Sequence, residues 1–318
     1  MNSFHNIHDL IRWTKNYLTS KNIYYGHGTD NAFDEAVQIV LTTLGITSSP
    51  EDISSVQVNL RECQKVVHQV IRRVEERIPV AYLTNKAWFC GYEFYIDERV
   101  LIPRSPIGEL ISNISTWIWE EPKYILDMCT GSGCIAIACS YAFPQALIDA
   151  VDISAPALAV TKHNIVLHGV QDRVTPILSD LFNELNHKKY DIILANPPYV
   201  KADDIISLPP EYQFEPVIGL SPPGKDGLDI IRRLLLSSSE YLTDKGILIC
   251  EVGYQQSSLT QQYPQIPFIW LEFNHGGTGV FMLKKSQLMV SKKYLIPGEA
   301  GTKKGNQNLS LIKIFSPN

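Results

Sequence analysis

The feature that most constrains the fold is an alternation of short apolar runs and helical patterns that begins at Tyr124. Seven runs are predicted as strands: Tyr124–Cys129, Leu147–Asp152, Val174–Ser179, Asp191–Ala195, Gly246–Glu251, Phe268–Phe273 and Val280–Leu283. Helical patterns fill three of the intervals: Cys134–Ala142, Pro156–His168 and Gly227–Leu242. Strands joined by crossover helices form a parallel sheet, so this region predicts a doubly wound α/β domain. Its ligand site is expected at the carboxyl ends of the strands.

The chain before this domain has a different pattern of apolar residues. Apolar residues recur at helical spacing from about Asn6 to Ala81. Three β-type runs follow, at residues 88–89, 94–96 and 100–102. The predicted segments are a helical domain over residues 1–84, a β-hairpin linker over 85–104 and the α/β domain over 105–285. The first helix of the α/β domain is expected from Ile107 to Trp119, with Pro106 in its first turn.

The last segment, residues 286–318, is predicted to be a basic, flexible tail. From Lys284 onward the chain has seven lysines and a single acid, Glu299. Segments of this composition are usually solvated. The alternative interpretation is a weak RNA-directed arm.

Composition narrows the class of protein. The formal net charge is -5, which argues against a general nucleic-acid binder, because affinity for nucleic acid depends on Lys and Arg that neutralise phosphates. No two of the six cysteines form a Cys-x-x-Cys pair, so no metal site is expected, and the thiols are interpreted as reduced packing residues. The N-terminus does not have the pattern of a signal peptide, and no apolar run approaches the roughly 18 residues of a membrane span. A soluble, cytoplasmic protein is therefore expected.

A glycine-rich turn follows the first predicted strand. Gly131 and Gly133 allow the backbone to approach a ligand closely and to donate from its N–H groups. The same turn matches Gly-x-Gly-x-x-Ala through Ala136, so a nicotinamide cofactor is a rival interpretation. The residues predicted to bind a cofactor are Asp127, Cys129, Thr130, Gly131, Ser132, Gly133, Asp152, Asp180, Leu181 and Asn196.

The acids around this turn favour S-adenosylmethionine. Asp127, interpreted as part of the turn, would repel a pyrophosphate but suits a cofactor that carries an amino group. Asp152 ends the second strand and suits a ribose hydroxyl pair with either cofactor. Asp180 ends the third strand, where it could accept from an adenine amino group beside the apolar wall of Leu181. A turn cap is the alternative role for Asp180.

The second motif is Asn196-Pro197-Pro198-Tyr199, directly after the buried run Asp191–Ala195. Proline cannot donate to a strand ladder, so the chain must leave the sheet here as a stiff turn. Such a turn at the carboxyl end of a strand presents its side chains to the ligand site. An ordinary Asn-Pro turn is the alternative, which the position of the motif in an alternating α/β domain disfavours.

These residue types suit methyl transfer to a planar NH2 group. The lone pair of such a nitrogen is delocalised, and attack on a methyl sulfonium draws positive charge onto it. The Asn196 side-chain oxygen and the Pro197 carbonyl can accept from both N–H bonds and stabilise that charge, and Tyr199 can stack on the planar group. Asn196, Pro197 and Tyr199 are the predicted catalytic residues, and together with Pro198 they are the predicted substrate-binding residues. The chemistry alone leaves glutamine amides and adenine equally open.

The chain resembles the HemK-like protein-glutamine methyltransferases from about Ile7 to Leu283. The shared motifs are Phe94-Tyr95-x-Asp97-x-Arg99-Val100-Leu101-Ile102-Pro103-Arg104, then Asp127–Gly133, then Asn196–Tyr199. The resemblance implies a class I, Rossmann-like seven-stranded domain, an N-terminal helical domain for substrate recognition and a hairpin linker. It also implies S-adenosylmethionine as the methyl donor and a protein glutamine amide as the acceptor.

Within this family the chain resembles the branch that modifies large-subunit ribosomal protein three. The residues that carry this likeness are Tyr24–Asn31, Arg77–Thr84 and Pro103–Glu109. The release-factor branch typically has Pro-Arg-Pro-Asp-Thr, from which Ser105-Pro106-Ile107 departs. A release-factor glutamine methyltransferase and an adenine-amino nucleic-acid methyltransferase acting on a flipped base stay open as alternatives. The partner implied is the ribosomal protein, with RNA nearby if methylation takes place during ribosome assembly.

Overall fold

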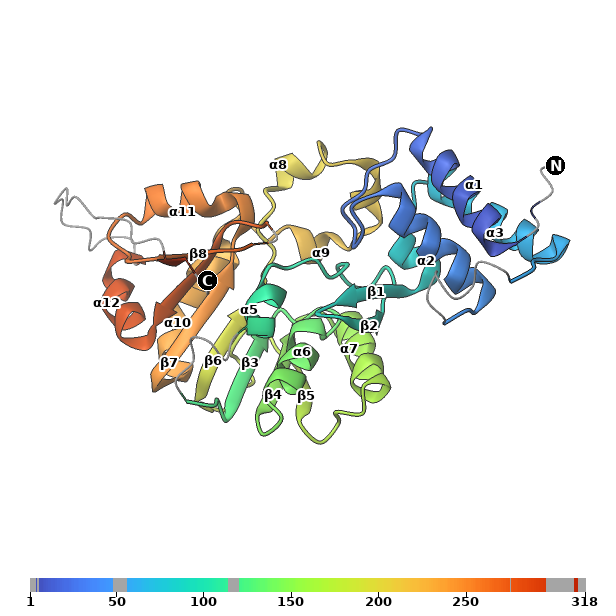
Figure 1. The fold of residues 1–318 in the computed structure, drawn as a ribbon. Helices are drawn as coiled ribbons and strands as arrows, with labels where there is room; N and C mark the ends of the chain where they lie inside the picture. Colours follow the sequence, from blue (N-terminus) through green and yellow to red (C-terminus); the bar gives the residue numbers. More distant parts are fainter. Residues whose placement is uncertain are drawn as a thin grey trace.

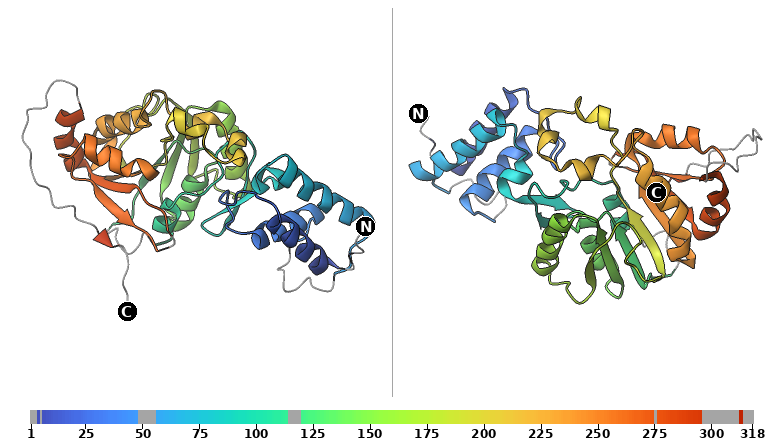
Figure 2. Two further views of the ribbon diagram at one scale, coloured as in Figure 1. Left: turned by 90° about the horizontal axis from the view of Figure 1, so that it is seen from above. Right: turned by 180° about the vertical axis from the view of Figure 1, so that it is seen from behind.

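The computed structural model describes residues 4, 6–47, 56–113, 120–274, 276–295 and 312–313. Figure 1 shows a helical unit at the N-terminus, joined by a short hairpin to an α/β unit built on one large sheet. The helical unit extends from one end of the α/β unit in the views of Figure 2 as well. Within the described residues, no helix has both the length and the apolar character that a bilayer crossing requires.

Asparagines begin the first three helices of the N-terminal unit. The helices are α1 (Ile7–Thr19), α2 (Ala32–Leu44), α3 (Leu60–Glu75) and the short α4 (Val80–Thr84). The side chains of Asn6, Asn31 and Asn59 accept hydrogen bonds from N–H groups of the first turns, which would otherwise lack partners. Each helix turns an apolar face toward a shared core, so the segment folds as one helical bundle.

The hairpin has two strands, β1 (Lys86–Phe89) and β2 (Tyr92–Tyr95), which pair antiparallel. The expected third strand at residues 100–102 does not form. The Val100 carbonyl accepts from the Tyr82 hydroxyl at 2.7 Å, and the Ile102 N–H donates to Glu215 Oε1 at 3.1 Å. Because side chains already satisfy these backbone groups, no partner strand is needed there.

The predicted seven-stranded sheet is present. Its strands are β3 (Tyr124–Met128), β4 (Leu147–Asp152), β5 (Val174–Leu178), β6 (Tyr190–Ala195), β7 (Leu242–Glu251), β8 (Ile269–Glu272) and β9 (Val280–Lys284). Their order is β8-β9-β7-β6-β3-β4-β5, and the two-residue strand β10 (Ile312–Lys313) extends the β8 edge. Strand β9 runs antiparallel to both of its neighbours, whereas β7, β6, β3, β4 and β5 are parallel. The class I, Rossmann-like fold expected from the sequence is confirmed.

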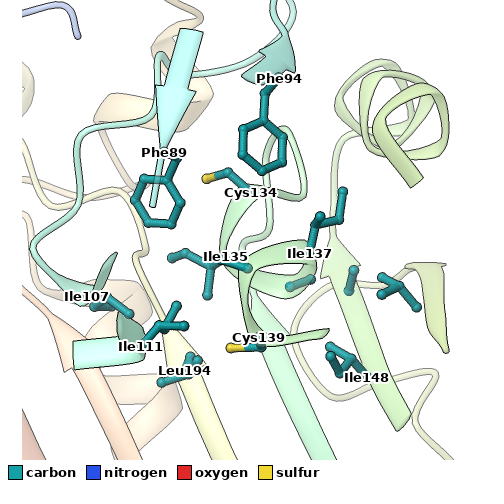
Figure 3. Packing of buried hydrophobic residues seen from close by; sticks show 14 of the residues in the cluster. Phe89, Phe94, Ile107, Ile111, Cys134, Ile135, Ile137, Cys139, Ile148 and Leu194 are labelled. Atoms are coloured by element: carbon teal, nitrogen blue, oxygen red, sulfur yellow. The ribbon is translucent and has the colours of Figure 1, made fainter. Parts of the chain in front are cut away.

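Helices cover both faces of the sheet. On one face lie α5 (Ile107–Asn113), α6 (Cys134–Ala142) and α7 (Ala155–Leu167), which pack with the hairpin. In Figure 3, Phe89 and Phe94 of the hairpin lie on either side of Cys134 and above Ile135 of α6, so the hairpin shares the core of the α/β unit. The other face is covered by α10 (Asp229–Tyr241), α11 (Gln256–Gln262) and α12 (Lys285–Leu295). The predicted extension of α5 to Trp119 lies outside the described residues.

The expected boundary at residue 285 is wrong, because the predicted tail begins with helix α12. Leu288, Ser291 and Leu295 are buried against α10 and β7. Lys292, one of the lysines that suggested a solvated segment, lies on the outer side and pairs with Glu240 at 2.6 Å. The number of lysines suggested a solvated segment, although Leu288, Ser291 and Leu295 recur at helical spacing and form a buried face.

A segment between β6 and α10 carries α8 (Ala202–Ile205), the 3-10 helix η2 (Pro210–Phe214) and α9 (Val217–Leu220). Figure 1 shows it reaching from the sheet toward the N-terminal helices. Glu211 of η2 is fully buried and accepts from Arg73 Nη1 at 3.1 Å and Arg77 Nη2 at 3.0 Å. Arg73, itself buried, also binds Glu35 of α2. Buried ion pairs therefore hold this segment on the helical unit.

Candidate active site

A cavity of about 290 Å³ lies at the carboxyl ends of β3, β4, β5 and β6, where a doubly wound sheet binds its ligand. Of the predicted cofactor-binding residues, eight line it: Cys129, Thr130, Gly131, Ser132, Asp152, Asp180, Leu181 and Asn196. Asp127 and Gly133 lie behind the lining. Of the predicted substrate-binding residues, Asn196 and Pro198 line the cavity, whereas Pro197 and Tyr199 do not.

The turn after β3 contains three left-handed residues, two of which, Cys129 and Gly131, line the cavity. Cys129, Gly131 and Gly133 have φ angles of 62°, 57° and 83°. A Cβ at Gly133 would lie 2.9 Å from Thr161 Cγ2, so any larger residue would push the turn away from α7. The Thr161 hydroxyl donates to the Gly131 carbonyl at 2.7 Å and fixes the turn from behind. The sequence therefore folds here into a backbone cradle whose position is set by α7.

Asp127 lies in β3, not in the turn as the sequence suggested. Its side chain is fully buried, and Oδ2 accepts from the Thr130 hydroxyl and from the Ala136 N–H, the latter at 3.0 Å. Burial raises the pKa of Asp127 to about 7. Oδ1 has no hydrogen-bond partner among the described residues. The carboxyl group thus joins both ends of the turn, and it reaches the cavity through Thr130.

Acids end the next two strands at the cavity wall. Asp152 accepts from the Gly131 N–H and the Ser154 N–H, each at 2.9 Å, so it connects the β4 end to the glycine turn. Each of its oxygens keeps a second lone pair for a ligand hydroxyl. Asp180 pairs with Arg233 of α10 at 2.9 Å, and Leu181 beside it is buried in a left-handed conformation. The Asp180 side chain is thus held at the cavity wall by an ion pair.

The Asn196–Tyr199 turn leaves β6 beside this cradle. Asn196 is half-buried, and within the described residues its side-chain amide makes no hydrogen bond to the protein. A polar amide lining a cavity without a protein partner is available to a ligand. Pro197 is buried and Pro198 is half-buried, which gives the turn a fixed path.

Tyr199 points toward β7. Its hydroxyl donates to Glu251 Oε1 at 2.8 Å, and its ring lies against Gly253. Glu251 is a residue that the sequence reasoning did not single out. The available signal was an acid at the end of a buried strand, beside the strand that carries Asn196.

The wall opposite the turn comes from distant parts of the chain. Arg104 lines the cavity and binds Glu215 through Nη1 at 2.5 Å and Nη2 at 2.7 Å. Glu215 is buried and directly precedes Pro216, which begins the cavity-lining stretch 216–223. No periodic pattern marks this segment, so its role was not predictable.

His27 lies behind the same wall. It is buried, its ring packs 4.4 Å from the Tyr212 ring, and its Nε2 is 3.8 Å from Glu215 Oε2. Burial lowers the pKa of His27 to about 4, so the ring is neutral. His27 is thus a packing residue behind this wall.

A mostly parallel seven-stranded sheet with a glycine cradle after its first strand and acids after the next two defines a class I methyltransferase. Residues 110–207 match the methyltransferase small domain. A fold comparison finds a ribosomal protein L11 methylase from Lactobacillus delbrueckii subsp. bulgaricus, 18% identical, with a TM-score of 0.42 over 60% of this chain and 85% of that one.

Two curated relatives cover nearly the whole chain. The chain is 46% identical to the ribosomal protein uL3 glutamine methyltransferase of Francisella tularensis subsp. tularensis, over 92% of this chain and 94% of the relative. It is 42% identical to the Neisseria gonorrhoeae enzyme of the same name, over 89% and 95%. The chain therefore belongs to this family of glutamine methyltransferases. The resemblance seen in the sequence is confirmed, and the nicotinamide alternative is excluded.

Proposed function

We propose that this protein transfers a methyl group from S-adenosylmethionine to the side-chain amide nitrogen of a glutamine in ribosomal protein uL3. The observation that carries the proposal is the Asn196 amide, which has no partner among the residues that the structure describes and lines the same cavity as the glycine cradle. A donor and a planar acceptor can meet there. The substrate protein is that of the two curated relatives, which match this chain over nearly its full length.

The residues present fit the cofactor. The turn offers the backbone of Gly131 to the cavity, and Gly133 lets this turn pack closely against Thr161 of α7. Asp152 can accept from ribose hydroxyls, and Asp180 can accept from the adenine amino group beside Leu181. Bound there, S-adenosylmethionine supplies an electrophilic methyl group on a sulfonium. Asp127 contributes by holding Thr130 and the start of α6.

The acceptor is held by the Asn196–Tyr199 turn. The Asn196 side-chain oxygen and the Pro197 carbonyl accept from the two N–H bonds of the glutamine amide, and the Tyr199 ring borders its plane. These acceptors stabilise the positive charge that develops as the N–C bond forms and the C–S bond breaks. The electron pair of the broken bond stays on sulfur, and the nitrogen loses one proton to water. Orientation of the two groups can supply on the order of 7–11 kcal/mol of the barrier.

The test is methyl transfer to defined acceptors. Purified enzyme and labelled S-adenosylmethionine are incubated separately with uL3, a peptide release factor and nucleic acid, and the products are mapped by mass spectrometry. One methyl group on a glutamine of uL3 is expected, and no label in the other two. Label in nucleic acid alone or in the release factor alone would overturn the proposal. No label in any acceptor would favour a ribosome-assembly protein with a vestigial site.

The same proposal places the enzyme in the cytoplasm, where ribosomal proteins are made. RNA lies near the substrate if methylation takes place during ribosome assembly. Free uL3 and an assembly intermediate, compared as acceptors, separate these two settings: faster transfer to the intermediate is expected only if RNA takes part.

A further inference from the structure

A buried carboxylate supports the turn that holds the acceptor. Glu251 ends β7, is 5% exposed and does not line the cavity. Ser105 Oγ donates to its Oε2 at 2.5 Å, and the Tyr199 hydroxyl donates to its Oε1 at 2.8 Å. Each carboxylate oxygen therefore has its own donor. A buried acid is costly unless it is hydrogen-bonded in this way, so both donors matter to it.

The position of Glu251 follows from the sheet. Ala195 of β6 pairs with Cys250 of β7, so Asn196 and Glu251 leave neighbouring strands at the same level. Glu251 consequently lies beside the start of the acceptor turn, within reach of the tyrosine that closes it. Ser105 comes from the exit of the hairpin, so this one carboxylate joins three segments that are distant in sequence.

Two glycines confine the tyrosine further. A Cβ at Gly253 would lie 2.6 Å from Tyr199 Cε2, and one at Gly227 would lie 2.5 Å from the Tyr199 carbonyl oxygen. Both glycines have positive φ, 47° and 77°, which favours glycine at each position. Gln255 also donates to the Tyr199 carbonyl, at 3.3 Å. Tyr199 is thus held by contacts to the edge of its ring, to its hydroxyl and to its main-chain carbonyl.

The Tyr199 hydroxyl keeps its proton in this buried environment. Burial and the neighbouring Glu251 raise the pKa of Tyr199 well above its ordinary value. The hydroxyl therefore keeps its proton and can donate it to Glu251.

We propose that Glu251 is a positioning residue for methyl transfer, which sets the Tyr199 ring against the acceptor amide through the Tyr199 hydroxyl. Ser105 orients Glu251 in turn, so the hairpin exit takes part in aligning the acceptor. This inference rests on the proposed function, because it assumes that the Tyr199 ring borders the substrate. Glu251 touches neither substrate nor cofactor in this scheme.

A double-mutant cycle tests the inference. Glu251→Ala and Tyr199→Phe each remove the hydrogen bond while the aromatic ring stays. Each is expected to lower kcat about 10- to 100-fold, because a misplacement of about 1 Å can cost on the order of 100-fold. The double variant should be no slower than the slower single variant, because both changes remove one interaction. The Kd for S-adenosylmethionine should stay within about threefold of wild type in all three, since the cradle is untouched.

The conservative variant Glu251→Gln separates positioning from charge. Its amide oxygen can still accept from Tyr199, and its NH2 can donate to Ser105 Oγ. We expect kcat within about threefold of wild type, and this rescue is not expected if the carboxylate itself exchanges a proton with the substrate. If Glu251→Ala does not fold, Ser105→Ala replaces it in the cycle. It removes the second donor to Glu251, so it should lower kcat less than Glu251→Ala and should have no further effect in the Tyr199→Phe background.

A matched control lies at the other end of the sheet. Tyr190 donates to buried Asp149 at 2.6 Å, the same kind of bond in the same sheet, and neither residue lines the cavity. Tyr190→Phe should lower the unfolding temperature and leave kcat unchanged. The inference would be overturned if Glu251→Ala kept the wild-type kcat, or if the effects of the two single variants multiplied in the double variant. Either outcome would leave the proposed function intact. Failure of the proposed function appears differently, as absence of glutamine methylation by the wild-type enzyme.

Discussion

The two walls of the cavity are built on different principles. The wall proposed to bind the cofactor, the cofactor wall, is local: the glycine turn follows β3, Asp152 ends β4, and Asp180 comes shortly after β5. The opposite wall, formed by Arg104 and residues 216–223 and named the acceptor wall for the proposed protein substrate, is assembled over long sequence distances. Arg104 and Glu215 are 111 residues apart, and Arg73 and Glu211, which attach this wall to the helical unit, are 138 residues apart. A common cofactor can be bound by a local motif. A particular protein acceptor needs a surface to which several parts of the chain contribute.

The largest effect is expected where the acceptor wall is attached to the helical unit. Arg73→Met leaves Glu35 without its buried partner and removes one from Glu211. Breaking a buried ion pair by removing one partner costs about 3–5 kcal/mol of unfolding free energy. Denaturant unfolding measures this loss, and kcat should fall in parallel because the 216–223 wall loses its anchor.

The neighbouring residue on the same helix is the control. Arg72 pairs with Glu76 on the surface of α3. Exposed pairs contribute about 0–1 kcal/mol, so Arg72→Met should change stability by no more than that. Equal losses of unfolding free energy in Arg73→Met and Arg72→Met would show that the buried ion pairs of Arg73 do not hold the acceptor wall.

The next effect is expected at the acceptor itself. Asn196→Ala removes the one side-chain oxygen proposed to hold the amide N–H. Loss of a single group that stabilises developing charge typically lowers kcat by about 100- to 1,000-fold. Steady-state transfer to uL3 measures kcat, and calorimetry measures S-adenosylmethionine binding, which the β3 cradle should largely preserve. Asn16→Ala, an exposed asparagine of α1, is the matched control. Transfer at the wild-type rate in Asn196→Ala would contradict the proposed role of Asn196.

This comparison also explains what the sequence could and could not predict. The cofactor wall was predictable because strand periodicity and a glycine turn are local patterns, and eight of the ten predicted residues line the cavity. The prediction failed where tertiary contacts override local signals. Val100–Ile102 has the composition of a strand, yet Tyr82 and Glu215 satisfy its backbone. The lysines of α12 suggested a solvated tail, although Leu288 and Leu295 pack against the sheet. Glu251 and Glu215 could not be placed without the partners that the fold brings to them.

A substitution in the cofactor wall should act mainly on cofactor binding. Gly133→Ala places a Cβ 2.9 Å from Thr161 Cγ2 and forces a φ of 83° on alanine. The left-handed backbone alone costs about 1–2 kcal/mol, and displacement of Thr161 shifts Gly131, to which Thr161 is bonded. We expect S-adenosylmethionine affinity to fall about tenfold, which is about 1.4 kcal/mol. Gly169→Ala is the control, because Gly169 has a φ of 66° and open space around it. Gly169→Ala should lower the unfolding free energy without changing the affinity for S-adenosylmethionine. Equal affinities in Gly133→Ala and Gly169→Ala would contradict the proposed role of the glycine turn in cofactor binding.

The smallest effect is expected on the pH dependence of stability, through Asp127, which is buried behind the cofactor wall and binds Thr130 and Ala136. Its pKa is raised by burial to about 7, far above the roughly 3.9 of an unfolded chain. Between these values the folded state binds more protons than the unfolded state, so stability is highest at low pH and is lost as pH rises through about 7. From pH 6 to pH 8 this group alone should lower the unfolding free energy by about 1 kcal/mol. His27, whose pKa is lowered to about 4 from 6.5, acts in the opposite direction as pH rises through 6.5, and this term is the same in wild type and Asp127→Asn, so only their difference reports Asp127. Asp127→Asn keeps an oxygen for Thr130 and Ala136 but cannot ionise, so its unfolding free energy should fall less over the same range. Parallel pH profiles for Asp127→Asn and wild type would show that the carboxyl is already ionised inside the folded turn.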